Sequence, residues 1–170
     1  MSDPASGVDP RAARLVELLA GRRATLAVAE SLTGGLIGAR VTTVPGASAV
    51  FVGGVVSYAT ALKERLLGVP GDLLAAEGAV HPAVAEAMAA GVRDLCGASY
   101  GLAVTGVAGP EPQDGRPVGT VHAAVYGASG VTHGDFLFRG SRDRVRAATV
   151  EAAIDLLIGV LEANVGEQFG

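Results

Sequence analysis

The sequence has few aromatic residues and only one cysteine: it contains no tryptophan, three tyrosines and four phenylalanines among 170 residues. A single thiol, Cys96, cannot form a disulfide within the chain, which fits a cytoplasmic setting. Charged residues make up only 18% of the chain, and the net charge of -4 differs from the basic footprint of a nucleic-acid binder. Apolar runs are too short to span a membrane, and the polar start has no signal-peptide core. We therefore expect a cytoplasmic protein that binds neither nucleic acid nor membranes.

Several sequence motifs are also missing. The chain contains no G-x-x-x-x-G-K-[ST] phosphate loop, no G-x-G-x-x-G after its first strand and no G-x-S-x-G nucleophile elbow. Its three histidines, His81, His122 and His133, do not have the spacing of metal ligands, and there is no Cys/His cluster. These absences argue against P-loop, dinucleotide-binding and α/β-hydrolase assignments, and we expect no metal and no cofactor.

Small apolar residues dominate what is present. Hydrophobic residues account for 49% of the chain, and there are 25 glycines. This composition is typical of a compact globular protein whose helices pack closely on a sheet. We expect a flexible N-terminal tail over residues 1–9 and one domain over residues 10–165.

The order of the predicted elements indicates the architecture. Helices are expected over residues 10–21, 33–41, 60–67, 83–96 and 141–162. Strands are expected over residues 25–29, 49–58, 100–106, 118–126 and 131–138. Helices and strands alternate early, and the last two strands are joined by so short a connection that they must be antiparallel neighbours. The predicted fold is a single-domain, three-layer α/β/α sandwich with a mixed, mainly parallel sheet and an antiparallel hairpin.

Hydroxyl groups and one lysine gather near the ends of the first two strands. Ser31 follows the first strand, Ser48 precedes the second, and Tyr58 and Lys63 follow it. Ligands of open α/β sheets bind outside the carboxyl ends of the strands, so this passage predicts a site. A serine nucleophile needs a base, which a histidine or Lys63 can supply. Lysine serves as a base only where desolvation or a nearby cation lowers its pKa, and the alternative is that Lys63 is a solvated surface residue.

A glycine pair and two arginines suggest a phosphorylated small molecule. Thr33 is a candidate N-cap, and Gly34 and Gly35 would let an anion approach the free amides at the helix start. The structural alternative for the glycine pair is a tight strand-to-helix turn. Arg142 and Arg146, four residues apart on the last predicted helix, can hold a phosphate or lower the pKa of Lys63.

Together, several motifs in one order resemble the C-terminal domain of the competence/damage-inducible protein CinA. They are AESLTGG at 29–35, PGASA at 45–49, GGVVSY at 53–58 with Lys63, VTGVAGP at 104–110, PVGTV at 117–121, and Arg142 with Arg146. Stand-alone members of this family are nicotinamide-nucleotide amidohydrolases. The resemblance implies an α/β/α fold, hydrolysis of nicotinamide mononucleotide to nicotinic acid mononucleotide and ammonia without a metal or cofactor, and a homodimer.

The resemblance also implies roles for individual residues. Ser48 matches the nucleophile, with Tyr58 and Lys63 as its activating partners, and Ser31 is the rival nucleophile. The residues implied to bind substrate are Ser31, Thr33, Gly34, Gly35, Thr105, Gly106, Arg142 and Arg146.

The chain departs from the family pattern in one loop. Residues 111–115 read EPQDG where the family has a glycine-rich loop, Arg116 replaces a common lysine, and Leu32 stands where cysteine is frequent. An acidic loop would repel a phosphate placed beside it. Two alternatives therefore stay open: a non-catalytic nucleotide-binding or regulatory module linked to competence or DNA damage, and an amidase for another substrate.

Overall fold

The computed structural model describes residues 7–167, and the side chains of residues 7–164. The helices of this part are α1 (Pro10–Gly21), α2 (Leu36–Thr42), the 3-10 turn η1 (Ala47–Ala49), α3 (Thr60–Leu67), α4 (Gly71–Glu77), α5 (Pro82–Cys96) and α6 (Arg142–Glu167). The strands are β1 (Leu26–Glu30), β2 (Phe51–Val56), β3 (Tyr100–Gly106), β4 (Thr120–Gly127) and β5 (Gly130–Leu137).

The strands form one mixed sheet in the order β2-β1-β3-β4-β5. Strand β1 pairs in parallel with both β2 and β3, β4 runs antiparallel to β3, and β5 runs antiparallel to β4. Only β4 therefore opposes the direction of the other four strands. The chain leaves β1 toward β2 and then crosses back to β3 on its other side. The carboxyl ends of β1 and β3 thus form the switch point where open α/β sheets bind ligands.

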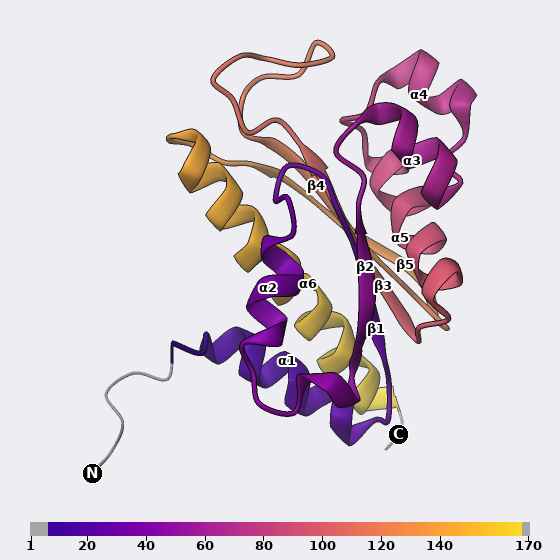
Figure 1. The fold of residues 1–170 in the computed structure, drawn as a ribbon, viewed down its shortest axis with the longest axis vertical. Helices are drawn as coiled ribbons and strands as arrows, with labels where there is room; N and C mark the ends of the chain where they lie inside the picture. The colour runs from indigo at the N-terminus through magenta and orange to yellow at the C-terminus, as the bar shows by residue number, and fades with distance from the viewer. Residues whose placement is uncertain (1–6, 168–170) are drawn as a thin grey trace.

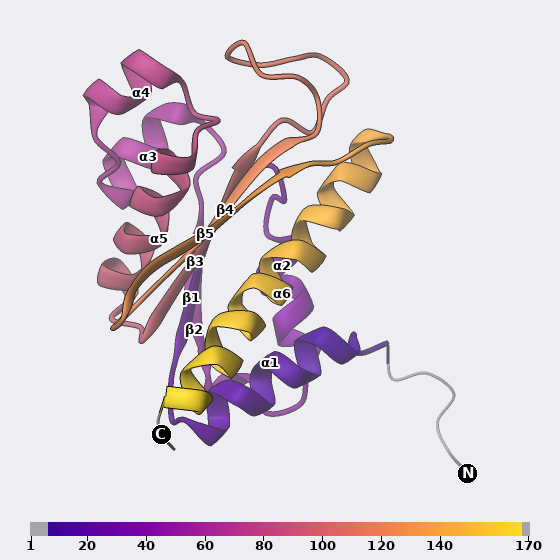
Figure 2. The same ribbon diagram turned by 180° about the vertical axis from the view of Figure 1, so that it is seen from behind.

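Helices cover both faces of the sheet, which confirms the predicted three-layer α/β/α fold. In Figures 1 and 2, α1, α2 and α6 lie on one face, and α3, α4 and α5 lie on the other. Each face has its own apolar core. Leu102, Val104 and Ile154 belong to the core on the α6 side, whereas Ala103, Met88 and Val92 belong to the core on the α5 side. Strand β1 is buried at all five positions because both layers cover it.

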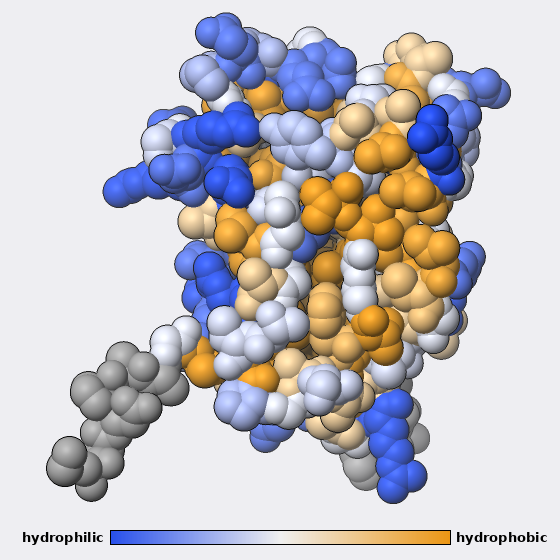
Figure 3. Space-filling model, in the orientation of Figure 1, coloured by the Kyte–Doolittle hydropathy of each residue, from blue (hydrophilic) through white to orange (hydrophobic). Residues whose placement is uncertain are grey.

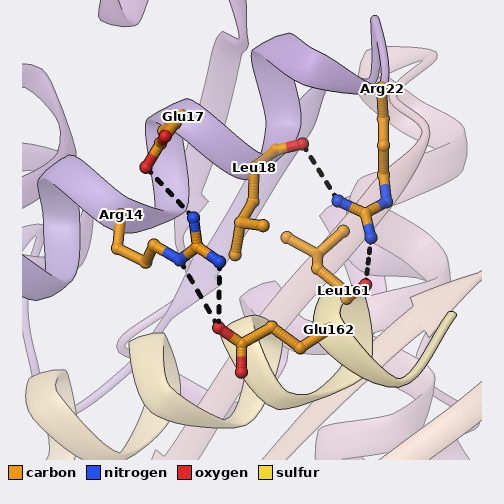
Figure 4. Close-up of polar contacts among 6 residues, drawn as sticks. All are labelled: Arg14, Glu17, Leu18, Arg22, Leu161 and Glu162. Carbon is orange, nitrogen blue, oxygen red and sulfur yellow. Dashed lines mark hydrogen bonds and ion pairs between the residues drawn. The ribbon is translucent and has the colours of Figure 1, made fainter. Parts of the chain in front are cut away.

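Arg14 and Arg22 link α1 to α6, and each also contacts a residue of α1 itself (Figure 4). Arg14 donates to Glu17 at 3.1 Å and to Glu162 at 3.4 Å. Arg22 donates to the carbonyl oxygens of Leu18 and Leu161. Exposed ion pairs contribute about 0–1 kcal/mol each, so the apolar side chains between the helices supply most of the stabilisation. This packing holds one end of the long helix whose other end reaches the candidate site.

Glycine permits the closest approaches between layers. A Cβ atom added to Gly91 of α5 would lie 1.9 Å from the carbonyl oxygen of Leu67 in α3. One added to Gly101 of β3 would lie 2.0 Å from the carbonyl oxygen of Ala89. Backbone atoms cannot rotate away as side chains do, so the spacing of α3, α5 and the sheet depends on the missing side chains.

The predicted elements are confirmed, with shifted boundaries near the polar turns. Helix α1 starts at Pro10 with Asp9 as its N-cap, as the sequence indicates. Helix α2 begins later than predicted, at Leu36, and its N-cap is Gly35 in the left-handed region rather than Thr33. The predicted strand over 49–58 is shorter, because residues 47–49 form η1. Most of the tail predicted over residues 1–9 lies outside the described residues. Within residues 7–167, no helix is long and apolar enough to cross a bilayer.

Strand β2 forms one edge of the sheet and carries exposed apolar side chains. Val52 and Val56 are 49% and 47% exposed, and Leu36 and Leu66 nearby in the sequence are also exposed. The space-filling view shows apolar side chains over the centre of the face where β2 lies (Figure 3). Pairing along β2 is irregular, because its register with β1 shifts between Leu26 and Ala27. Such a bulge hinders further strand addition at an edge.

Candidate active site

A polar cavity of about 170 Å³ lies at the carboxyl ends of β1 and β3. Ser31 follows β1, Thr105 and Gly106 end β3, and Lys63 projects from α3. Tyr58 precedes α3 and Arg142 begins α6, and both also line the cavity. Segments that are distant in the chain therefore meet at the switch point of the sheet. The predicted site residues that line this one cavity are Ser31, Tyr58, Lys63, Thr105, Gly106 and Arg142.

Lys63 is buried and has three oxygen neighbours. Lys63 is only 1% exposed, and its Nζ lies 3.0 Å from Ser31 Oγ. Nζ also donates to the carbonyl oxygen of Ser57 at 2.6 Å and contacts that of Tyr58 at 3.4 Å. No carboxylate lies among these three partners. The alternative that Lys63 is a solvated surface residue is therefore wrong.

Burial lowers the pKa of Lys63 to about 8 from its ordinary 10.5, and the Asp114 carboxylate partly offsets this by favouring the charged form. The sequence suggested that Arg142 or Arg146 lowers the pKa of this lysine. Loss of solvent is instead the cause. The result is an amine that loses its proton in a range where a general base is useful.

The lowered pKa predicts a pH-dependent stability. Below pH 8, Lys63 is protonated in both states and the folded state bears the full penalty of burying a cation. Between pH 8 and 10.5 the unfolded chain binds more protons, so the free energy of unfolding rises with pH by about 3 kcal/mol. Urea unfolding gives the free energies of unfolding of wild type and Lys63→Met at pH 7 and pH 10.5. The difference between the two proteins should change between these pH values by the amount of this rise. A difference that stays constant would contradict the lowered pKa.

Glu30 organises the turn that carries Ser31, a role that the sequence analysis missed. Its carboxylate is buried, accepts a hydrogen bond from Thr33 Oγ1 at 2.6 Å, and accepts from the amides of Ile37 and Gly38 at 2.9 and 3.1 Å. The sequence analysis left the amides at the start of this helix open to an anionic ligand. In the structure α2 starts at Leu36, and the chain's own carboxylate occupies the amides of Ile37 and Gly38. An acidic residue ending a fully buried strand was the available signal.

The remaining residues of this turn shape it without lining the cavity. Thr33 is fully buried and donates its hydroxyl hydrogen to Glu30. Gly34 and Gly35 have φ values of 61° and 109°. Arg146 donates to the carbonyl oxygens of Leu32 and Thr33 at 3.0 and 3.4 Å. The structural alternative for the glycine pair, a tight strand-to-helix turn, is therefore the one observed.

Ser48 lies far from Lys63. It is exposed in η1, before β2, and lines a separate shallow cleft with Gly46 and Phe51. Tyr58 and Lys63 follow the other end of β2, a strand of six residues that spans about 20 Å. The expectation that Ser48 shares a crevice with Tyr58 and Lys63 is wrong, because a strand separates them. Ser31, the rival nucleophile, holds the position beside the lysine.

Arg142 connects three segments around the cavity. Its guanidinium donates to Tyr58 Oη at 3.1 Å and to the carbonyl oxygen of Gly109. Tyr58 is 60% exposed, so its ring stands at the mouth of the cavity. Of the two predicted arginines, Arg142 is the one that lines the cavity.

The three histidines have other partners. His81 caps α5 by accepting from the amide of Ala83, His122 contacts Asp135 at 2.6 Å, and His133 contacts Glu86 at 3.1 Å. None of the three histidines lines the cavity, whereas Lys63 Nζ lies 3.0 Å from Ser31 Oγ.

The fold and cavity define a three-layer α/β/α domain with a buried serine–lysine pair at its switch point. The family model for the CinA C-terminal domain matches residues 8–161, and the chain belongs to this family. A CinA-like protein of Frankia casuarinae is 57% identical over 140 residues, which cover 82% of this chain and 32% of that protein. A putative competence-damage inducible protein of Desulforamulus reducens is 54% identical over 132 residues, covering 78% and 32%. The chain thus spans about a third of the length of these relatives.

Solved structures agree with this assignment. The competence/damage inducible protein CihA from Agrobacterium tumefaciens superposes with a TM-score of 0.87 at 35% identity, covering 95% of this chain and 99% of that one. A CinA superfamily protein from Klebsiella pneumoniae superposes with a TM-score of 0.87 at 32% identity, covering 90% and 96%. The family and the fold predicted from the sequence are therefore confirmed.

Proposed function

We propose that this domain is an amidohydrolase in which Ser31 is the nucleophile and Lys63 is its general base. The observation that carries the proposal is the 3.0 Å contact between Lys63 Nζ and Ser31 Oγ, in a polar cavity where burial lowers the pKa of the lysine to about 8. A domain that only binds a nucleotide does not need a desolvated amine against a serine hydroxyl. Burying that amine lowers stability, so a role for it is expected.

The surroundings of Lys63 suit a neutral amine. A neutral amine has two N–H groups and one lone pair. The carbonyl oxygens of Ser57 and Tyr58 can accept the two hydrogens, which leaves the lone pair for the proton of Ser31. The two carbonyls thus orient the base toward the nucleophile.

The reaction follows from this arrangement. Ser31 Oγ attacks the carboxamide carbon as its proton passes to Lys63 Nζ. Lys63 then protonates the departing nitrogen, and the C–N bond breaks. Ammonia departs, and the acyl group remains on Ser31 as an ester. Water attacks the ester, Lys63 accepts its proton, and the acid departs as Ser31 regains its hydrogen.

We propose nicotinamide mononucleotide as the substrate, with nicotinic acid mononucleotide as the product. The family resemblance suggests this substrate, and the cavity supports a polar ligand of modest size. Arg142 has guanidinium hydrogens beyond those given to Tyr58 and Gly109, and these can bind an anionic group.

The pH profile of ammonia release from nicotinamide mononucleotide tests the proposal. In the presence of a chelator, kcat/KM should rise about tenfold per pH unit below pH 8 and level off above it, because only neutral Lys63 accepts the proton. A coupled ammonia assay from pH 6 to 9.5 measures this curve. A rate that is flat or falls over this range would rule out Lys63 as the base. Folded protein that binds the nucleotide without releasing ammonia would favour the binding module.

A further inference from the structure

The segment between β3 and β4 forms a roof over the candidate site. Its residues 107–119 form the loop at the top of Figure 1, coloured between the shades of β3 and β4. Within it, Gln113 and Arg116 exchange backbone hydrogen bonds of 3.2 and 2.8 Å around Asp114 and Gly115. Both central residues have positive φ, as the tight Asp-Gly turns of hairpins require. The tip of the roof is therefore a defined hairpin turn.

Asp114 fastens this roof to the opposite wall of the cavity. Its carboxylate accepts from the amide of Ala79 at 3.0 Å, and its side chain fills the space that a Cβ on Gly78 would occupy. Arg116 adds a contact of 3.7 Å to Glu77. Ala79 itself lines the cavity and accepts a hydrogen bond from Thr105 Oγ1 at 2.8 Å. The roof is thus tied to a segment that is in turn tied to β3.

The roof places an acidic side chain in a cavity whose other charged side chains are basic. Glu111 and Gln113 line the cavity together with Lys63 and Arg142. Asp114 of the same roof favours the charged form of Lys63, so the charge of this carboxylate acts on a residue of the cavity. A cavity lined by one carboxylate and two basic side chains suits a ligand that carries charge of both signs.

We propose that Glu111 determines specificity for amides that carry a permanent positive charge on the ring bearing the carboxamide. This inference rests on the proposed function and names its substrate class more closely. The oxidised nicotinamide ring is such a group, because its nitrogen is a pyridinium. The reduced ring has the same carboxamide and nearly the same shape but is neutral. Glu111 then stabilises the cation, while Arg142 binds the anionic part of the ligand.

The test compares the oxidised and reduced forms of nicotinamide mononucleotide with wild type and Glu111→Gln. Both proteins also carry the substitution Ser31→Ala, so that no turnover occurs, and dissociation constants are measured by calorimetry. We expect Glu111→Gln to weaken binding of the oxidised form by about tenfold and to change binding of the reduced form by less than about twofold. Glu64→Gln is the matched control, because Glu64 is exposed next to Lys63 in the sequence but does not line the cavity.

A second variant tests the anchor of the roof. Asp114→Ala removes both the contact with Ala79 and a carboxylate whose charge acts on Lys63, so it should weaken binding of both forms and that of the oxidised form at least as much. Equal losses for both forms in Glu111→Gln, or no loss for either, would overturn the inference. Because binding is measured without catalysis, charge selectivity in a protein that releases no ammonia would sustain this inference while contradicting the proposed function.

Discussion

Ser31→Ala and Lys63→Met should each lower the rate of nicotinamide mononucleotide hydrolysis by about a thousandfold or more, and Ser48→Ala should leave it within about twofold. The first two changes remove the attacking oxygen and the base that lies 3.0 Å from it. Groups that act as one unit do not add, so the double variant should be hardly slower than either single one. Steady-state ammonia release at pH 8.5 measures the four variants against wild type.

Control measurements distinguish lost chemistry from lost folding. Ser31→Ala should retain the unfolding temperature of wild type to within a few degrees and should still bind the nucleotide. Lys63→Met relieves the burial of a cation but leaves the Ser57 carbonyl without its partner, so its unfolding must be measured before its rate is interpreted. A large loss in Ser48→Ala with none in Ser31→Ala would restore the nucleophile that the family resemblance first suggested.

Gly91→Ala should destabilise the domain by about 3 kcal/mol or more. The new methyl group would lie 1.9 Å from the carbonyl oxygen of Leu67 and 2.7 Å from its carbonyl carbon, so α3 and α5 must separate. Helix α3 also carries Lys63, and its displacement should lower the catalytic rate of the protein that remains folded. Urea unfolding followed by circular dichroism measures the stability.

Gly159→Ala is the matched control for this change. Gly159 also lies inside a helix, but nothing is within 4 Å of its added methyl group. Alanine is the better helix former by about 1 kcal/mol, so this variant should be as stable as wild type or more stable. Similar losses in both variants would contradict this account, because they would show that the close approach of α3 does not govern the effect.

Local patterns in the sequence predict most of the fold. Strand β1 is an apolar run bounded by polar residues, and α1 begins at an Asp-Pro pair, so both elements are visible locally. The predicted boundaries of helices are wrong where side-chain contacts compete with the local capping preference of a residue. Thr33 is a good N-cap by type, but its hydroxyl donates to Glu30 and α2 starts three residues later.

The candidate site is harder to predict because it depends on tertiary distances. Ser48 and Ser31 both lie near strand ends, yet only the position of β2 between Ser48 and Lys63 shows which serine meets the lysine. Burial of Lys63 is equally hidden, since the neighbouring Glu64 makes the segment read as polar surface. The roof anchor at Asp114 joins residues 35 positions apart and leaves no periodic signal. The homodimer and the cytoplasmic location stay predictions.

The most direct test of the central claim is to find which serine carries the acyl group during turnover. Wild type is mixed with nicotinamide mononucleotide, quenched in acid within milliseconds and digested with trypsin. Ser31 falls in the peptide 24–40 and Ser48 in the peptide 41–63, so the two sites separate cleanly. We predict that peptide 24–40 gains the mass of the substrate less ammonia, and that Ser31→Ala abolishes this gain. The same adduct on peptide 41–63 would contradict the account.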